Sequence, residues 1–196
     1  MYAQLRRVFD IRVVLVLALC VMLGAAVSHA AQVVYTVVLN GPSESPPNAS
    51  PGTGTATVAI DAVAHTMYLH LDFAGTIGNT TACHIHAATA VAGTGTAGVA
   101  TTTPYFAGFP IGVTAGSYDI TLDMTLASSY NPSYVTAHGG TTAQAELDLF
   151  AAIAAGKAYL NVHTSTVPSG EIRGFLQPLA VATEASTWGS IKALYR

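Results

Sequence analysis

The sequence is poor in charged residues, in cysteine and in tryptophan. The shortages of charged residues and of cysteine each exclude a class of protein. Only 9% of the 196 residues are charged, with seven basic residues against ten acidic ones. So few basic residues offer no patch for nucleic acid or for an anionic lipid surface. Two cysteines in the whole chain cannot form the several disulfides that stabilise small disulfide-rich secreted domains. A hydrophobic core must therefore stabilise the fold.

Apolar and small residues are abundant instead. Hydrophobic residues make up 51% of the chain, and there are 18 glycines among many alanines and threonines. Such a composition is typical of short strands joined by tight turns rather than of a helical bundle, which favours Glu, Lys and Leu. The length is that of one domain, or of one domain with tails.

The first residues have the pattern of an export signal. Arginines precede an apolar run over 13–27, and Ser28-His29-Ala30 forms a small-x-small cleavage site. Residues 1–30 are therefore predicted to be a signal peptide, and the mature protein to be secreted or held in the cell envelope. An uncleaved membrane anchor is the alternative, although the run is shorter than the roughly 20 apolar residues of a span.

Cleavage after Ala30 would change the charge and the cysteine count. Four basic and nine acidic residues would remain, a net charge of −5, with no membrane span in the mature chain. Cys83 would be the remaining cysteine, so no intrachain disulfide is expected. We expect it to be a buried small hydrophobic residue.

Alternating apolar and polar residues predict a series of strands. The pattern is typical of an antiparallel β-sandwich in which one face of each strand is buried. The predicted strands are 32–40, 53–60, 67–73, 82–87, 118–124, 158–164 and 171–177. The segments 53–60 and 67–73 are expected to form a hairpin.

One segment predicts a short helix. Residues 142–156 are rich in alanine and leucine, and Gly156 is suited to the position after the last turn. The expected apolar stripe consists of Leu147, Phe150, Ala151 and Ala154.

Three histidines are candidates for a metal site. His84 and His86 are two residues apart on a predicted strand, so their side chains share one face, while Cys83 and Ile85 face the core. If this strand pairs with the strand of His163, three imidazoles converge. Imidazole clusters suit zinc, copper or nickel.

Such a site would need a fourth ligand, for which His70 or His138 is a candidate. The alternative is that these histidines only form hydrogen bonds with the backbone or with carboxylates.

A second cluster lies near the end of the predicted sheet. Glu171 and Arg173 are two apart, with Ile172 between them facing inward, and Asn161 shares a face with His163. A structural ion pair between Glu171 and Arg173 is the simplest interpretation. Two alternatives stay open: Arg173 binds a carboxylate-bearing substrate, or Glu171 orients a ligating imidazole.

Signals for catalysis are weak. The chain has no Gly-x-Ser-x-Gly elbow, and Gly52-Thr53-Gly54 opens a strand rather than a helix, so a nucleotide site is not indicated. A hydrolase using Glu171 and a histidine stays open as a third hypothesis. We favour a protein that is not an enzyme.

Several short motifs stand out along the chain. They are Leu39-Asn40-Gly41, Glu44-Ser45-Pro46-Pro47, Gly52-Thr53-Gly54-Thr55-Ala56, Cys83-His84-Ile85-His86, Tyr159-Leu160-Asn161-Val162-His163-Thr164 and the run from Pro168 to Leu176. Together these motifs resemble the CHRD domain, a module found in chordin and in many bacterial secreted proteins. The resemblance covers residues 32–178.

The resemblance implies an immunoglobulin-like or superoxide-dismutase-like β-sandwich over 31–178, and a binding or structural module for an extracellular protein or a matrix. A histidine-based copper or zinc protein, with redox activity as an extension, is the alternative. Residues 179–196 are expected to be a linker and a short tail, in which Trp188, Ile191 and Tyr195 lie at helical spacing. The tail is a candidate for sorting, for partner binding or for docking on its own domain.

Overall fold

The computed structural model of the chain describes residues 32–179. The predicted signal peptide and the predicted tail beyond Leu179 lie outside the described residues.

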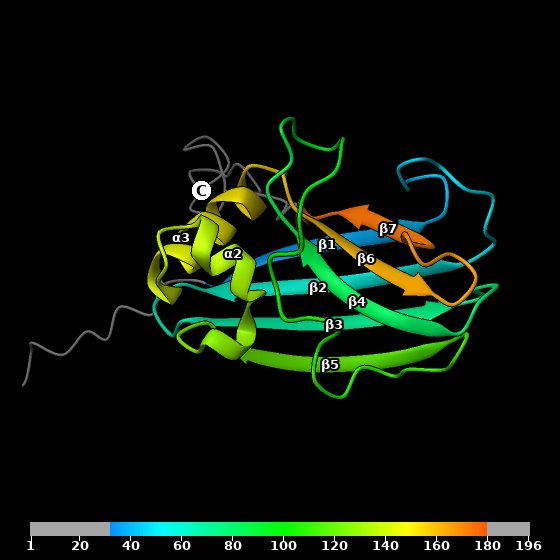
Figure 1. The fold of residues 1–196 in the computed structure, drawn as a ribbon, viewed down its shortest axis with the longest axis horizontal. Coiled ribbons are helices and arrows are strands. Elements are labelled where there is room, and N and C mark those ends of the chain that lie inside the picture. The colour runs from blue at the N-terminus through cyan, green and yellow to red at the C-terminus, as the bar shows by residue number, and fades with distance from the viewer. Residues whose placement is uncertain (1–31, 180–196) are drawn as a thin grey trace, which may run out of the picture. The chain divides into compact units, whose positions relative to one another are not determined.

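Eight strands and three helical segments follow one another along the described chain (Figure 1). The strands are β1 (Val33–Asn40), β2 (Thr53–Asp61), β3 (Thr66–Ala74), β4 (Thr80–His86), β5 (Gly116–Asp123), β6 (Tyr159–Thr164), β7 (Ile172–Phe175) and β8 (Gln177–Pro178). The helical segments are the 3₁₀ turn η1 (Ala127–Ser129), α2 (Pro132–Ala137) and α3 (Thr142–Ala154).

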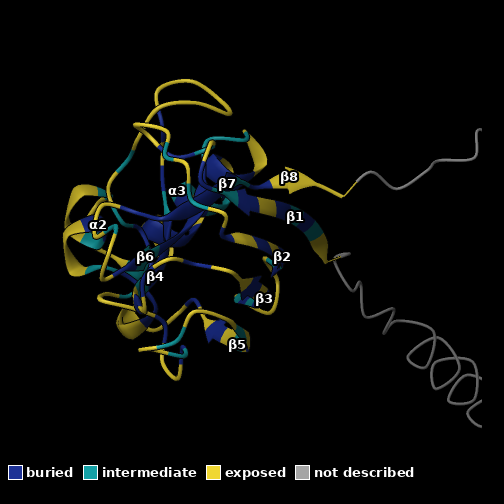
Figure 2. Cartoon of the chain, turned by 90° about the vertical axis from the view of Figure 1, so that its right-hand side faces the viewer, coloured by how far each residue is buried: buried dark blue, intermediate teal, exposed yellow. Residues whose placement is uncertain are grey.

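All the strands belong to one antiparallel sheet with the order β4-β6-β7-β1-β2-β3-β5, to which β8 adds beside β1. The sheet curls over itself, so that β4 and β6 lie across from β2, β3 and β5 (Figures 1 and 2). The predicted all-β, sandwich-type fold is thereby confirmed. The predicted hairpin is confirmed too, as β2 pairs with β3 over its whole length.

The core lies between these two layers, where the inward positions of each strand meet. Cys83 and Ile85 are fully buried in it, as the alternation in β4 predicted. Other completely buried core side chains are Leu39, Val58, Met67, Leu69, Leu71, Leu149, Leu160, Val162 and Ile172.

Helix α3 confirms its predicted ends but not its predicted face. The Thr141 hydroxyl accepts the Gln144 N–H at the start, and Gly156, with a φ of 66°, follows the last turn. The predicted stripe is wrong: Leu147 is 64% exposed, and the helix buries the face that carries Leu149 and Ile153. Because alanines and leucines of this helix occur on most of its sides, its sequence did not show which face is buried.

The sequence did not predict η1 or α2. The six residues of α2 are too few for a helical period to be recognised, although Asn131 caps the helix and Pro132 occupies its first turn. Within residues 32–179, no helix is long and apolar enough to cross a membrane.

Candidate functional site

One face of β4, β6 and β7 carries a set of polar and aromatic side chains. In the sheet register His84 lies opposite Asn161, His86 opposite Tyr159, and Asn161 opposite Arg173 on its other side. His163 follows two residues after Asn161 on the same face. Directly opposite residues are roughly 4.5–5.5 Å apart at Cβ, so these side chains form one cluster.

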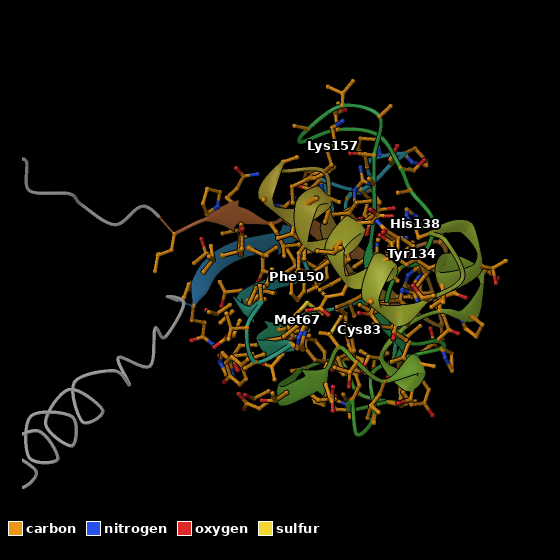
Figure 3. The ribbon with its side chains drawn as sticks, turned by 90° about the vertical axis from the view of Figure 1, so that its left-hand side faces the viewer. Met67, Cys83, Tyr134, His138, Phe150 and Lys157 are labelled. Carbon is orange, nitrogen blue, oxygen red and sulfur yellow. The ribbon has the colours of Figure 1, made fainter. Side chains whose placement is uncertain are left out.

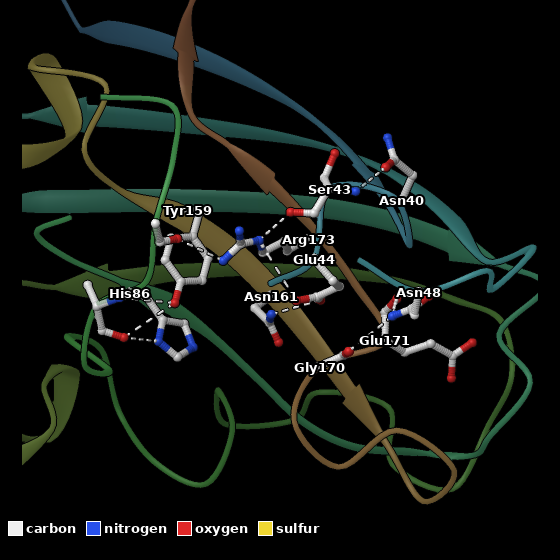
Figure 4. A network of polar contacts seen from close by, with 12 residues as sticks. Asn40, Ser43, Glu44, Asn48, His86, Tyr159, Asn161, Gly170, Glu171 and Arg173 are labelled. Atoms are coloured by element: carbon white, nitrogen blue, oxygen red, sulfur yellow. Dashed lines mark hydrogen bonds and ion pairs between the residues drawn. The ribbon is translucent and has the colours of Figure 1, made fainter. Parts of the chain in front are cut away.

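This face is covered rather than solvated. His84 is 6% exposed, Asn161 3% and Arg173 4%, because loops close over the strands. Ser43 and Gly95 each supply a carbonyl to the Arg173 guanidinium from two of these loops (Figure 4). Since buried polar groups need partners, the contacts of each side chain are informative.

The three histidines converge, as predicted. The ring centroid of His84 lies 5.2 Å from that of His86 and 4.7 Å from that of His163. One ring nitrogen from each residue lies within 4.8 Å of the corresponding nitrogens of the other two. The convergence depends on the pairing of β4 with β6, which the sequence prediction had left conditional.

Backbone carbonyls hold the outer side of two of the rings. His86 donates from Nδ1 to the Ala97 carbonyl at 2.9 Å, and His163 from Nδ1 to the Pro168 carbonyl at 2.9 Å. Because a carbonyl only accepts, each of these two contacts places a proton on Nδ1 of the ring.

The inner nitrogens of the three rings lie close together. Nδ1 of His84 lies 3.2 Å from Nε2 of His86, a hydrogen-bond contact whose donor is set by the His84 tautomer, and Nε2 of His163 is buried without a hydrogen-bond partner. With their Nδ1 atoms protonated, His86 and His163 each turn an unprotonated Nε2 towards the cluster. A cation between the rings would give the buried Nε2 of His163 a partner.

Burial keeps the three rings neutral. It lowers the pKa of His84 to about 3, with a further contribution from the neighbouring imidazoles His163 and His86. It also lowers the pKa of His86 to about 4, to which the charge of Arg173 contributes. The pKa of His163 is lowered chiefly by burial as well. At neutral pH each ring is therefore neutral and has one unprotonated nitrogen that can act as a ligand.

Tyr159 and Arg173 form a stacked column with His86. The Tyr159 ring lies parallel to that of His86, with 4.6 Å between their centroids, and the Arg173 guanidinium carbon lies 4.7 Å from the Tyr159 centroid. The Tyr159 hydroxyl contacts the backbone of Ala97, the residue whose carbonyl holds His86. Tyr159 was not predicted as a site residue, although period-2 alternation places it on the face of Asn161 and His163.

Glu44 is a buried acidic residue that the sequence prediction did not include among the site residues. Its carboxylate accepts from Asn161 Nδ2 at 2.9 Å and lies 3.8 Å from Arg173 Nε (Figure 4). Burial raises the pKa of Glu44 to about 7, against the opposing effects of Arg173, the Ser45 N–H and Asn161. Asn161 Oδ1 is buried and has no hydrogen-bond partner. The Glu44-Ser45-Pro46-Pro47 motif was the available signal.

The predicted ion pair between Glu171 and Arg173 is wrong. Arg173 pairs with Glu44 instead, and the fully buried Glu171 carboxylate accepts four hydrogen bonds. The donors are the hydroxyls of Ser50 and Thr164, both at 2.5 Å, and the N–H groups of Ile77 at 2.6 Å and Gly78 at 3.3 Å.

Burial acts to raise the pKa of Glu171, but these hydrogen bonds outweigh it and the pKa is lowered. None of the four partners is an imidazole, so the role of Glu171 is to join loops rather than to orient a histidine. The loops that meet at it are distant in sequence, which is why the pattern of β7 did not indicate them.

The expected fourth histidine ligand is also wrong. His70 projects from β3 towards Asp119 and Asp72, and His138 follows α2, where it stacks on Tyr134 and contacts Asp148 (Figure 3). Among residues 32–179, the metal-type cluster of side chains contains His84, His86 and His163 alone.

Comparison with known proteins gives one match. The CHRD domain matches residues 35–176, which include the three histidines, Glu44, Asn161 and Arg173. Neither a search of curated proteins nor a search of solved structures found a match. Because the match covers well over half of the chain and includes the motifs that build this face, the chain belongs to the CHRD domain family.

Proposed function

We propose that this domain binds a transition metal ion, zinc or copper, through His84 Nδ1, His86 Nε2 and His163 Nε2. The observation that carries the proposal is the inward convergence of three neutral imidazole nitrogens within 4.8 Å of one another. A cation among them would be bound by one nitrogen lone pair from each ring.

The surroundings of the rings support the same function. Histidines that bind metals almost always donate their other N–H to a carbonyl, a carboxylate or water, which fixes the tautomer and the ring direction. Here the Ala97 and Pro168 carbonyls take that role for His86 and His163. A set of three imidazoles without carboxylate or thiolate suits zinc and copper better than magnesium or calcium.

We further propose that the chain is exported through residues 1–30 and acts outside the cytosol. The arginines, the apolar run and the cleavage pattern support this proposal. A binding or structural module was our first expectation from the sequence. We now favour the metal-binding alternative, because a purely structural role leaves the buried, unpaired Nε2 of His163 unexplained.

Elemental analysis of the purified full-length protein tests the proposal. We expect about one equivalent of zinc or copper per chain after loading, and loss of that equivalent in a His84→Ala/His86→Ala variant. His70→Ala is the matched control, since His70 has carboxylate partners on β3 and β5 and should be dispensable for metal binding. Equal metal content in the wild type and the double variant would refute the proposal.

A further inference from the structure

We infer that the metal centre keeps its fourth coordination position open, and that Asn161 Oδ1 holds a small protic oxygen ligand there, a metal-bound water or hydroxide. The inference rests on the proposed function. It adds the class of ligand that the centre takes and the residue that would hold it.

The number of protein ligands is the first observation. In the part of the chain that the structure describes, three side chains form the cluster, and the other candidate histidines have carboxylate partners elsewhere. Closed structural zinc sites use four protein ligands, whereas sites that react keep three and bind water in the fourth position. Three histidines therefore indicate a centre of the open type.

The position of Asn161 is the second observation. It lies opposite His84 in the register, two residues before His163 on the same face, and diagonal to His86, which pairs with Tyr159. Asn161 is thus the sheet position that the three histidines surround. Its side chain is 3% exposed, so its polar atoms have little access to bulk water.

The unpaired oxygen of this amide is the third observation. Asn161 Nδ2 donates to Glu44, which fixes the direction of the amide, while Oδ1 has no partner. A buried acceptor without a donor costs about 1–3 kcal/mol. A ligand that carries a proton would satisfy it, whereas a bare anion would not.

Gly170 packs closely against the same amide. A Cβ atom at this position would lie 2.6 Å from Asn161 Nδ2, 2.9 Å from Asn161 Oδ1 and 2.8 Å from Glu44 Oε1. A residue without a side chain is therefore needed beside the unpaired oxygen.

Water and hydroxide both fit this acceptor. The Arg173 guanidinium, on the strand next to Asn161, lies 3.8 Å from the Glu44 carboxylate, so the two charges offset each other beside the cluster. Water and hydroxide each carry a proton with which they can donate a hydrogen bond to Asn161 Oδ1.

Electron–nuclear double resonance on the Cu(II)-loaded full chain tests the ligand directly. At about pH 8, where the Glu44 carboxylate is ionised and accepts from Asn161, we expect exchangeable proton couplings from a bound oxygen, larger than those of the imidazole N–H protons, that disappear in D₂O. If the histidines bind Cu(II) but no bound oxygen carries an exchangeable proton, the inference is overturned and the proposed function stays intact. Absence of any bound metal would overturn both.

An Asn161→Leu variant tests the role of the acceptor. Leucine has nearly the same volume as asparagine but cannot accept a hydrogen bond. The metal-bound water, which azide must displace, would therefore be held less firmly in the variant. We expect azide to bind the Cu(II)-loaded variant at least about fivefold more tightly than it binds the Cu(II)-loaded wild type. Equal azide affinity in the metal-loaded wild type and variant would contradict the role of Asn161. If the variant does not fold, the proton couplings of the wild type still decide the question.

Discussion

Tyr159 lies flat against His86, with 4.6 Å between the ring centroids and 7° between the ring planes. Its hydroxyl contacts the backbone of Ala97, whose carbonyl accepts the His86 N–H. One side chain thus packs against the imidazole and also holds its hydrogen-bond acceptor. Arg173 stacks on Tyr159 as well and donates to Gly95 in the same loop.

Removing the Tyr159 ring should therefore weaken metal binding. We expect Tyr159→Leu to lower the metal affinity by about tenfold or more, a typical effect of losing a group that positions a ligand. Tyr159→Phe keeps the stack and loses only the hydroxyl contact, so its affinity should lie between that of the leucine variant and that of the wild type. Competition titration with a chelator measures both variants. An unchanged affinity in Tyr159→Leu would show that the column does not position His86.

Cys83 should be irrelevant to the metal. It is fully buried on the core face of β4, and burial raises the pKa of its thiol, so it stays protonated. Metal content after loading should be the same in Cys83→Ala and in the wild type. Cys83→Ala should lose about 1–2 kcal/mol of folding stability, because it leaves a small cavity. Loss of metal together with the thiol would mean that the histidines are not the binding site.

Glu171→Ala should be among the most destabilising substitutions in the domain. It leaves two hydroxyls and two N–H groups without their acceptor, so we expect the free energy of unfolding to fall by about 3 kcal/mol or more. Urea denaturation measures it. Asp72→Ala is a control, since Asp72 is an exposed carboxylate on the outer face of β3.

The contribution of Glu171 should depend on pH in a defined direction. Its pKa is lowered in the folded state, so its stabilisation is complete above the pKa of the unfolded chain and is lost as the pH falls through the folded value. The difference in stability between the wild type and Glu171→Gln should therefore shrink in acid. A constant difference from about pH 7 to about pH 3 would contradict this role.

Glu44 should show the opposite dependence. Burial raises its pKa from 4.5 to about 7, so its protonated form is the one that folding favours. Its contribution to stability is complete below the unfolded pKa and is lost as the pH rises through the folded pKa. Relative to the wild type, Glu44→Gln should therefore gain stability between about pH 5 and about pH 8 in urea titrations. A relative loss over that interval would indicate that the ion pair with Arg173 dominates instead.

Gly170 and Gly93 form a matched pair for testing the covered face. Both have positive φ, 126° and 71°, but a Cβ at Gly170 would come within 2.6 Å of Asn161, whereas nothing lies within 4 Å at Gly93. We expect Gly93→Ala to cost about 1 kcal/mol for the backbone alone, and Gly170→Ala at least about 2 kcal/mol. Similar losses in thermal or urea unfolding would mean that the space over the amide is not confined.

Much of the fold was predictable because its signals are local. Alternation along each segment placed Cys83 and Ile85 in the core and His84 and His86 together on the other face, and Gly156 marked the end of α3. These features depend on the periods of strand and helix, which are properties of neighbouring residues. The motifs likewise indicated the family, since a family is identified by its sequence.

The candidate site was decided by tertiary structure. The pairing of β4 with β6 brings His163 to His84 and His86, and loops from distant parts of the chain supply Glu44 to Arg173 and four donors to Glu171. The buried face of α3 was likewise chosen by packing, because its local pattern allowed two faces. Sequence periodicity determines which side of a strand a residue occupies, but strand partners and covering loops depend on contacts between residues far apart, which local periods do not encode.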